Sequence, residues 1–117
     1  MPLELKVKTK GKEATYTRTE EPMLENLLDA LKVQRQEIVM YSDSKAVPTD
    51  KDNEKLINLR AEFAARFWGK GLTKKDVLSG VSSVEGLKTI EDAIALTLGM
   101  SIDDDDEDSK GDKDPKK

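Results

Sequence analysis

The chain has 117 residues and a net charge of −4, and its charged residues (38%) outnumber its hydrophobic ones (36%). This length is typical of one domain with a modest core. Because Cys and His are absent, disulfides, thiolate nucleophiles, imidazole-ligated metals and Ser-His-Asp triads are excluded. Most enzyme chemistry is therefore unavailable, and we expect no enzyme, cofactor or metal. No apolar run reaches about 18 residues, so we expect a soluble cytosolic protein without membrane span or signal peptide.

Residues 3–10 alternate apolar and charged side chains, which predicts a half-buried strand. Lys10-Gly11 offers a two-residue turn, and residues 13–18 return with β-branched and aromatic side chains. The sequence therefore predicts a β-hairpin. Two strands alone are marginal in water, so this hairpin has to pack on the helices that follow.

After Pro22 the apolar residues recur with helical spacing, which predicts an amphipathic helix capped by Thr19. Residues 38–41 either extend this helix or form a short strand. Residues 42–52 are rich in Asp and Ser and are expected to form a loop. The apolar stripe of the helix consists of Leu24, Leu27, Leu28, Leu31 and Ile38.

Residues 53–68 predict a second long helix, with two apolar stripes that together cover more than half of its circumference. Such a wide arc is typical of a central helix packed on both sides. An alternative interpretation leaves the arc around Phe67 and Trp68 for a partner, and both interpretations stay open. The stripes are Leu56, Leu59, Phe63 and Phe67, and Ile57, Ala61, Ala64 and Trp68.

Two further helices are expected after Gly69, which suits a helix C-terminus. Thr73 and Asp76 have the spacing of a capping box before a short helix, and the segment from Ser82 repeats that signature. Residues 89–98 predict the last helix. The expected fold class is α+β, with a short N-terminal β-hairpin packed on a small bundle of about four helices. The inward-facing residues of the last helix are Ile90, Ala93, Ile94 and Leu98.

Residues 103–117 hold eight acidic and four basic side chains, which leaves sixteen of each in the preceding body. The body is therefore neutral, and this segment carries the whole imbalance. No apolar side chain offsets the entropy of ordering it. We expect a single domain over residues 1–102 followed by a disordered acidic tail, whose deletion leaves the melting temperature almost unchanged.

Three ligand-binding signatures fail. The glycine-rich residues 69–73 lack the spacing of a phosphate-binding loop. A calcium loop starting at Asp106 would place Lys110 and Lys117 at ligand positions. The lysines of residues 6–12 form a basic strip, but a lysine-rich strand face is usually only solvated, and the acidic tail would compete with phosphate.

The order of these features is shared with a known family. It comprises the opening strand and turn of residues 3–13, the leucine-rich helix after Pro22, and the helix end Phe63-Ala64-Ala65-Arg66-Phe67-Trp68. A glycine-rich turn with Leu72-Thr73, the helix of residues 90–94 and the charged tail complete it. This layout resembles the tail assembly chaperones of long-tailed bacteriophages, particularly those of Gram-positive hosts. The resemblance covers the whole chain and carries over no catalytic or ligand-binding residue.

The resemblance implies a chaperone that binds the tape measure protein and recruits the major tail protein during tail morphogenesis in the host cytoplasm. It also implies absence from the mature virion. Self-association stays open, and neither nucleic acid nor membrane is expected as a partner. The alternatives are a minor structural or connector protein of the phage particle and a small nucleic-acid-binding regulator. The few expected strands speak against the first, and the neutral body speaks against the second.

The candidate partner-binding residues are Leu24, Leu28, Phe67 and Trp68. Exposed aromatic area of this kind marks interaction surfaces. Trp68 is the decisive probe, because its place next to Gly69 also suits a packed core residue. A Trp68→Ala variant that unfolds would place Trp68 in the core. A variant that folds but fails to keep a tape measure fragment soluble would place it in the surface.

Overall fold

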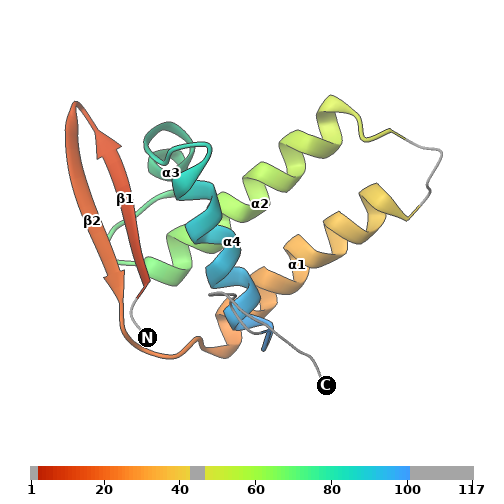
Figure 1. Cartoon of the computed structure of the whole chain (residues 1–117), viewed down its shortest axis with the longest axis horizontal. Coiled ribbons are helices and arrows are strands. Elements are labelled where there is room, and N and C mark those ends of the chain that lie inside the picture. Colours follow the sequence, from red (N-terminus) through yellow and green to blue (C-terminus); the bar gives the residue numbers. More distant parts are fainter. Residues whose placement is uncertain (1–2, 43–46, 101–117) are drawn as a thin grey trace, which may run out of the picture.

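The computed structural model describes residues 3–42 and 47–100 (Figure 1). The predicted acidic tail and its boundary at Ile102 lie outside the described residues. The described chain confirms the α+β class, with an N-terminal antiparallel hairpin and four helices. The elements are β1 (Leu3–Thr9), β2 (Lys12–Arg18), α1 (Leu24–Tyr41), α2 (Asp50–Trp68), α3 (Lys74–Gly80) and α4 (Glu85–Thr97).

The hairpin has the predicted turn at Lys10 and Gly11, and Leu5 of β1 pairs with Tyr16 of β2. Both turn residues have positive φ, 52° and 77°, as in the turns whose twist matches that of the flanking strands. Glycine reaches this region without strain. The turn chemistry therefore fixes which side chains of β1 face the core.

The apolar face of β1 docks on the helices. Leu5 and Val7 are buried, β1 packs against α3 and α4, and β2 packs against α2 (Figure 1). Gly80, at the end of α3, lies so close to β1 that an added Cβ would collide with the carbonyl oxygen of Lys8. The absence of a side chain there lets the helix approach the strand.

Helix α2 is the centre of the fold, because it packs against α1, α3, α4 and β2. Its C-terminal half buries both predicted stripes, while Ile57 in its N-terminal half is exposed. Phe63 stacks on Phe67 with 5.1 Å between ring centroids. On α4, the predicted inward residues Ile90, Ala93 and Ile94 are buried. The buried residues of α2 are Leu56, Ala61, Phe63, Ala64, Phe67 and Trp68.

The start of α1 differs from the prediction. Its N-cap is Met23 rather than Thr19, and the backbone N–H of Met23 donates to Oδ1 of Asn26 over 2.8 Å. The guanidinium of Arg18 donates to the carbonyls of Glu20 and Glu21, which holds this connection outside the helix. At the other end, the open question of residues 38–41 is resolved in favour of helix.

Two other helices begin earlier than predicted. Helix α2 starts at Asp50 because Thr49 and Asp52 form a capping box, so the expected loop of residues 42–52 is too long. Helix α4 starts at Glu85, and the hydroxyl of Ser82 accepts from the N–H of Gly86 over 2.7 Å. The capping box explains the start of α2 better than the apolar periodicity does. The capping box predicted at Ser82 does not form, because the N-cap of α4 is Val84, which has no side-chain cap hydrogen bond.

Candidate protein-binding surface on α1

Helix α1 lies at the edge of the fold, beside α2 and against α4 (Figure 1). Half of the side chains that it buries are polar. Besides two aliphatic residues and Met40, three polar side chains are buried there, and one of them is a carboxylate. The buried residues of α1 are Asn26, Asp29, Ala30, Val33, Gln36 and Met40.

Polar anchors fix the rotation of α1 about its axis. Nε of Arg66 on α2 lies 3.1 Å from Oδ2 of Asp29, and the amide of Gln36 donates to the carbonyl of Asp52 over 3.2 Å. Near the other end, the guanidinium of Arg60 contacts Glu37 at 2.8 Å. Because buried polar groups need their partners, these contacts oppose any rotation that would turn the leucines inward.

The carboxyl of Asp29 is buried on the inward face of α1. Burial raises the pKa of this carboxyl above its ordinary value, while the charges of Arg66 and Lys32 oppose the rise. Oδ2 of Asp29 has no hydrogen-bond partner among the described residues, although it lies within ion-pair distance of Arg66. Burying the ionised carboxyl of Asp29 therefore costs free energy, and the ion pair with Arg66 offsets this cost only in part.

The outward face of α1 carries the leucine-rich stripe, here called the seam: Leu24, Leu28, Leu31, Arg35 and Ile38. Its four aliphatic side chains are between 44% and 79% exposed. Val39 is exposed beside it, and Leu27 is half-buried. Single exposed apolar residues are ordinary, but a largely apolar stripe along a helix marks a surface for another macromolecule.

The structure separates the four candidate residues into two pairs. Leu24 and Leu28 lie in the exposed seam, whereas Phe67 and Trp68 are only 2% and 3% exposed. The indole N–H of Trp68 donates to the carbonyl of Leu3 over 3.1 Å. The exposed apolar surface that we expected around Phe67 and Trp68 is therefore absent from the described fold, and the core interpretation of Trp68 fits its burial.

Phe67 and Trp68 hold the hairpin on the helices instead. The guanidinium of Arg18 lies 4.5 Å from the centroid of the Phe67 ring, and it donates to the Phe67 carbonyl over 2.6 Å. Together with the Trp68 bond to Leu3, this fixes the hairpin to the C-terminal end of α2. The carbonyl groups at a helix end need such donors.

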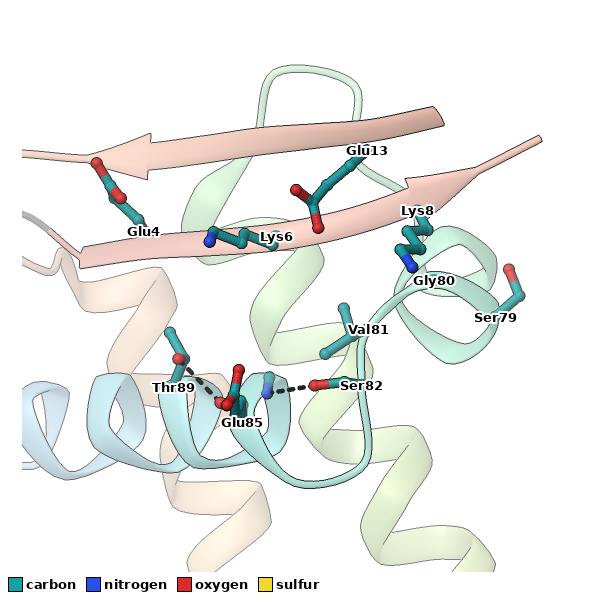
Figure 2. A pocket seen from close by; sticks show the side chains of 11 residues that line it. Glu4, Lys6, Lys8, Glu13, Ser79, Gly80, Val81, Ser82, Glu85 and Thr89 are labelled. Carbon is teal, nitrogen blue, oxygen red and sulfur yellow. Dashed lines mark hydrogen bonds between the residues drawn. The ribbon is translucent and has the colours of Figure 1, made fainter. Parts of the chain in front are cut away.

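A polar groove runs between β1 and the α3–α4 connection (Figure 2). It has a volume of about 490 Å³. Lys6 and Lys8 line it together with three glutamates, so the opposite charges nearly cancel, and the groove offers neither a phosphate nor a metal ion a strong field. Among residues 3–42 and 47–100, no three acidic side chains lie close enough together to hold a metal. The three glutamates of the groove are Glu4, Glu13 and Glu85.

A smaller cleft of about 170 Å³ lies between α2, α3 and α4. Leu78 and Ile57 flank it and are about half exposed, and Val81 and Leu87 line it. Its size suits one inserted side chain, whereas the seam spans most of α1. In the part of the chain that the structure describes, no helix has the length and apolar character needed to cross a membrane.

Sequence reasoning found the seam as a stripe but missed Arg35 within it. The signal is present in the chain, because the steps from Leu24 to Ile38 alternate between four and three residues, as in the seam of a coiled coil. What this spacing does not reveal is that the opposite face of α1 is the one that packs on α2.

An apolar helical face turned outward is typical of surfaces that bind another protein chain. Comparison with known proteins names the family: residues 1–117 match the family described as phage tail chaperone protein. The chain therefore belongs to the phage tail chaperones, which implies a non-enzymatic role and protein partners in the phage tail. No curated protein and no solved structure shows significant similarity to the chain.

Proposed function

We propose that this tail chaperone binds the tape measure protein through the seam of α1 and recruits the major tail protein to it. It acts in the cytoplasm of a Gram-positive host and is absent from the finished particle. The observation that carries the proposal is the outward seam of four aliphatic side chains on a helix whose other face is anchored by polar contacts. Membership in the tail chaperone family supports it.

The seam suits an elongated helical partner. A helix can lay its apolar side chains along such a stripe, and many copies along one long partner add up through multivalency. Leu24 and Leu28 belong to the proposed contact. Phe67 and Trp68 take no direct part in it, because their side chains are buried.

The proposal is tested by co-expressing the full chain with the tape measure protein of the same phage genome. The double variant Leu24→Ser/Leu28→Ser is expected to weaken binding by roughly a hundredfold, since each leucine contributes about 1.5 kcal/mol when buried. The tape measure protein then moves to the insoluble fraction. Circular dichroism is expected to show an unchanged fold, because both leucines are exposed.

The matched control is Leu78→Ser, which removes an equally apolar, half-exposed side chain from α3. It should leave the tape measure protein soluble. If the double variant solubilises the partner as well as the parent does, the seam is not the binding surface. Mass spectrometry of purified virions checks whether the chain is absent from the finished particle.

Finding the chain there as a stoichiometric component would instead favour a structural or connector protein.

A further inference from the structure

One cation interrupts the apolar seam of α1. Arg35 is exposed and lies on the same line as Leu28, Leu31 and Ile38, at the steps of three and four residues that define one helix face. From Leu24 to Ile38 the seam spans fourteen residues, or about 21 Å of helix. A second helix of two heptads would cover it in full, Arg35 included.

Arg35 has no opposite charge within its own helix face. The residues three and four positions away are Leu31, Lys32, Ile38 and Val39, none of which is acidic. No carboxylate among residues 3–42 and 47–100 lies within ion-pair distance of it. A guanidinium that becomes buried without a partner is costly. Any helix that covers the seam is therefore favoured if it brings its own carboxylate to this point.

We propose that the seam of α1 selects an amphipathic helix whose own apolar stripe carries one Asp or Glu, which pairs with Arg35 and sets the register of the two helices. A single polar residue within an apolar seam has this effect in coiled coils. The inference rests on the proposed function insofar as the tape measure protein supplies such a helix. The seam chemistry itself does not depend on that source.

A second copy of this chain fits the seam less well than a partner with a carboxylate. Two α1 helices in parallel would set one Arg35 against the other, and like charges across an interface are costly. Two antiparallel copies centred on Leu31 would set each Arg35 against leucine. Neither arrangement supplies a carboxylate on the seam.

Two synthetic 18-residue helical peptides test the selection. Both carry leucine at the seam positions, and they differ only in the central seam residue, which is Glu in one and Lys in the other. Fluorescence anisotropy with the full chain is expected to show at least about tenfold tighter binding of the Glu peptide, a difference that narrows at high salt. Binding of the two peptides within about twofold of each other would overturn the proposal.

Charge reversal makes the test specific to Arg35. Arg35→Glu is expected to invert the preference, so that the Lys peptide binds more tightly. Lys55→Glu makes the same charge change at an exposed position of α2 and should leave the preference as it is in the parent. If Lys55→Glu shifts the preference between the two peptides as much as Arg35→Glu does, the net charge of the chain determines peptide binding, and the proposal fails.

Two readouts separate this inference from the proposed function. If Arg35→Glu still solubilises the tape measure protein like the parent and shows no change in peptide preference, the inference fails while the proposed function stands. If the parent discriminates between the peptides but does not bind the tape measure protein, the proposed function fails and the inference stands. Sedimentation that shows a dimer displaced equally by both peptides would assign the seam to a second copy and overturn the inference.

Discussion

The two long helices α1 and α2 treat their apolar residues in opposite ways. Helix α2 has neighbours on several sides, and the aromatic end of its arc is fully covered. Helix α1 packs on one side only, buries Asn26, Asp29 and Gln36, and leaves most of its leucines outside. Apolar periodicity therefore identifies a helix, but the polar contacts available from the neighbouring helix decide which face is buried.

The largest effect is expected at the core of α2. Replacing the fully buried Phe63 by Ala removes a ring that stacks on Phe67. It should cost about 3–5 kcal/mol, which is a large part of the roughly 5–15 kcal/mol that stabilises a typical domain. Urea unfolding followed by circular dichroism measures the loss. A variant as stable as the parent would mean that α2 is not the centre of the fold.

A smaller effect is expected at the buried carboxylate of α1. Because burial raises the pKa of Asp29, its ionised form disfavours the folded state. The stability contribution of this group is complete below about pH 4 and is lost as the pH rises through the folded pKa. Asp29→Asn should thus be more stable than the parent at pH 7, and this advantage should shrink towards pH 4.

Urea unfolding at both pH values checks this difference. Glu54→Gln is the control, because it removes an exposed carboxylate from α2 whose charge is not among those that shift the pKa of Asp29. If Asp29→Asn is less stable than the parent at pH 7, the ion pair with Arg66 outweighs the cost of burial. The polar anchors would then stabilise α1 rather than only orient it.

The smallest effect on stability is expected in the seam. Leu28→Ala should change the free energy of unfolding by no more than about 0.5 kcal/mol, because the side chain is 63% exposed and leaves no cavity. The same chemical change in a buried position costs about 2–5 kcal/mol. A loss of that size in thermal unfolding would show that the seam is covered in the free protein.

Most of the fold was predictable because its signals are local. Alternation in β1, the Lys10-Gly11 turn and the capping box at Thr73 each depend on neighbouring residues, and the structure confirms them. The missed boundaries have nonlocal or overlooked causes. Arg18 donates hydrogen bonds to the carbonyls of Glu20 and Glu21, and these residues therefore stay outside α1. The capping box at Thr49 was overlooked because the segment around it has a composition typical of a loop.

The candidate site was harder to predict, because exposure is a property of the whole fold. Leu28 and Phe67 belong to equally convincing apolar stripes, yet one lies outside and the other inside. The difference in exposure depends on α2, where Arg66 and the carbonyl of Asp52 bind the polar side chains of α1 and keep that face inward. A single sequence does not reveal such pairings.

The hydrogen bond between Trp68 and Leu3 also has a consequence for folding during synthesis, because the first strand has to wait for residues that are made much later. The two residues are 65 positions apart, so at ordinary translation rates about 3–13 s pass between the synthesis of Leu3 and that of Trp68. Leu5 and Val7 stay uncovered for longer, because α3 and α4, which pack against β1, follow Trp68 in the chain. A lone hairpin is marginal in water in the meantime. Lys6 and Lys8 lie on the other face of the strand and give it positive charge. This charge disfavours strand pairing with other nascent copies of the chain that are translated from the same messenger RNA.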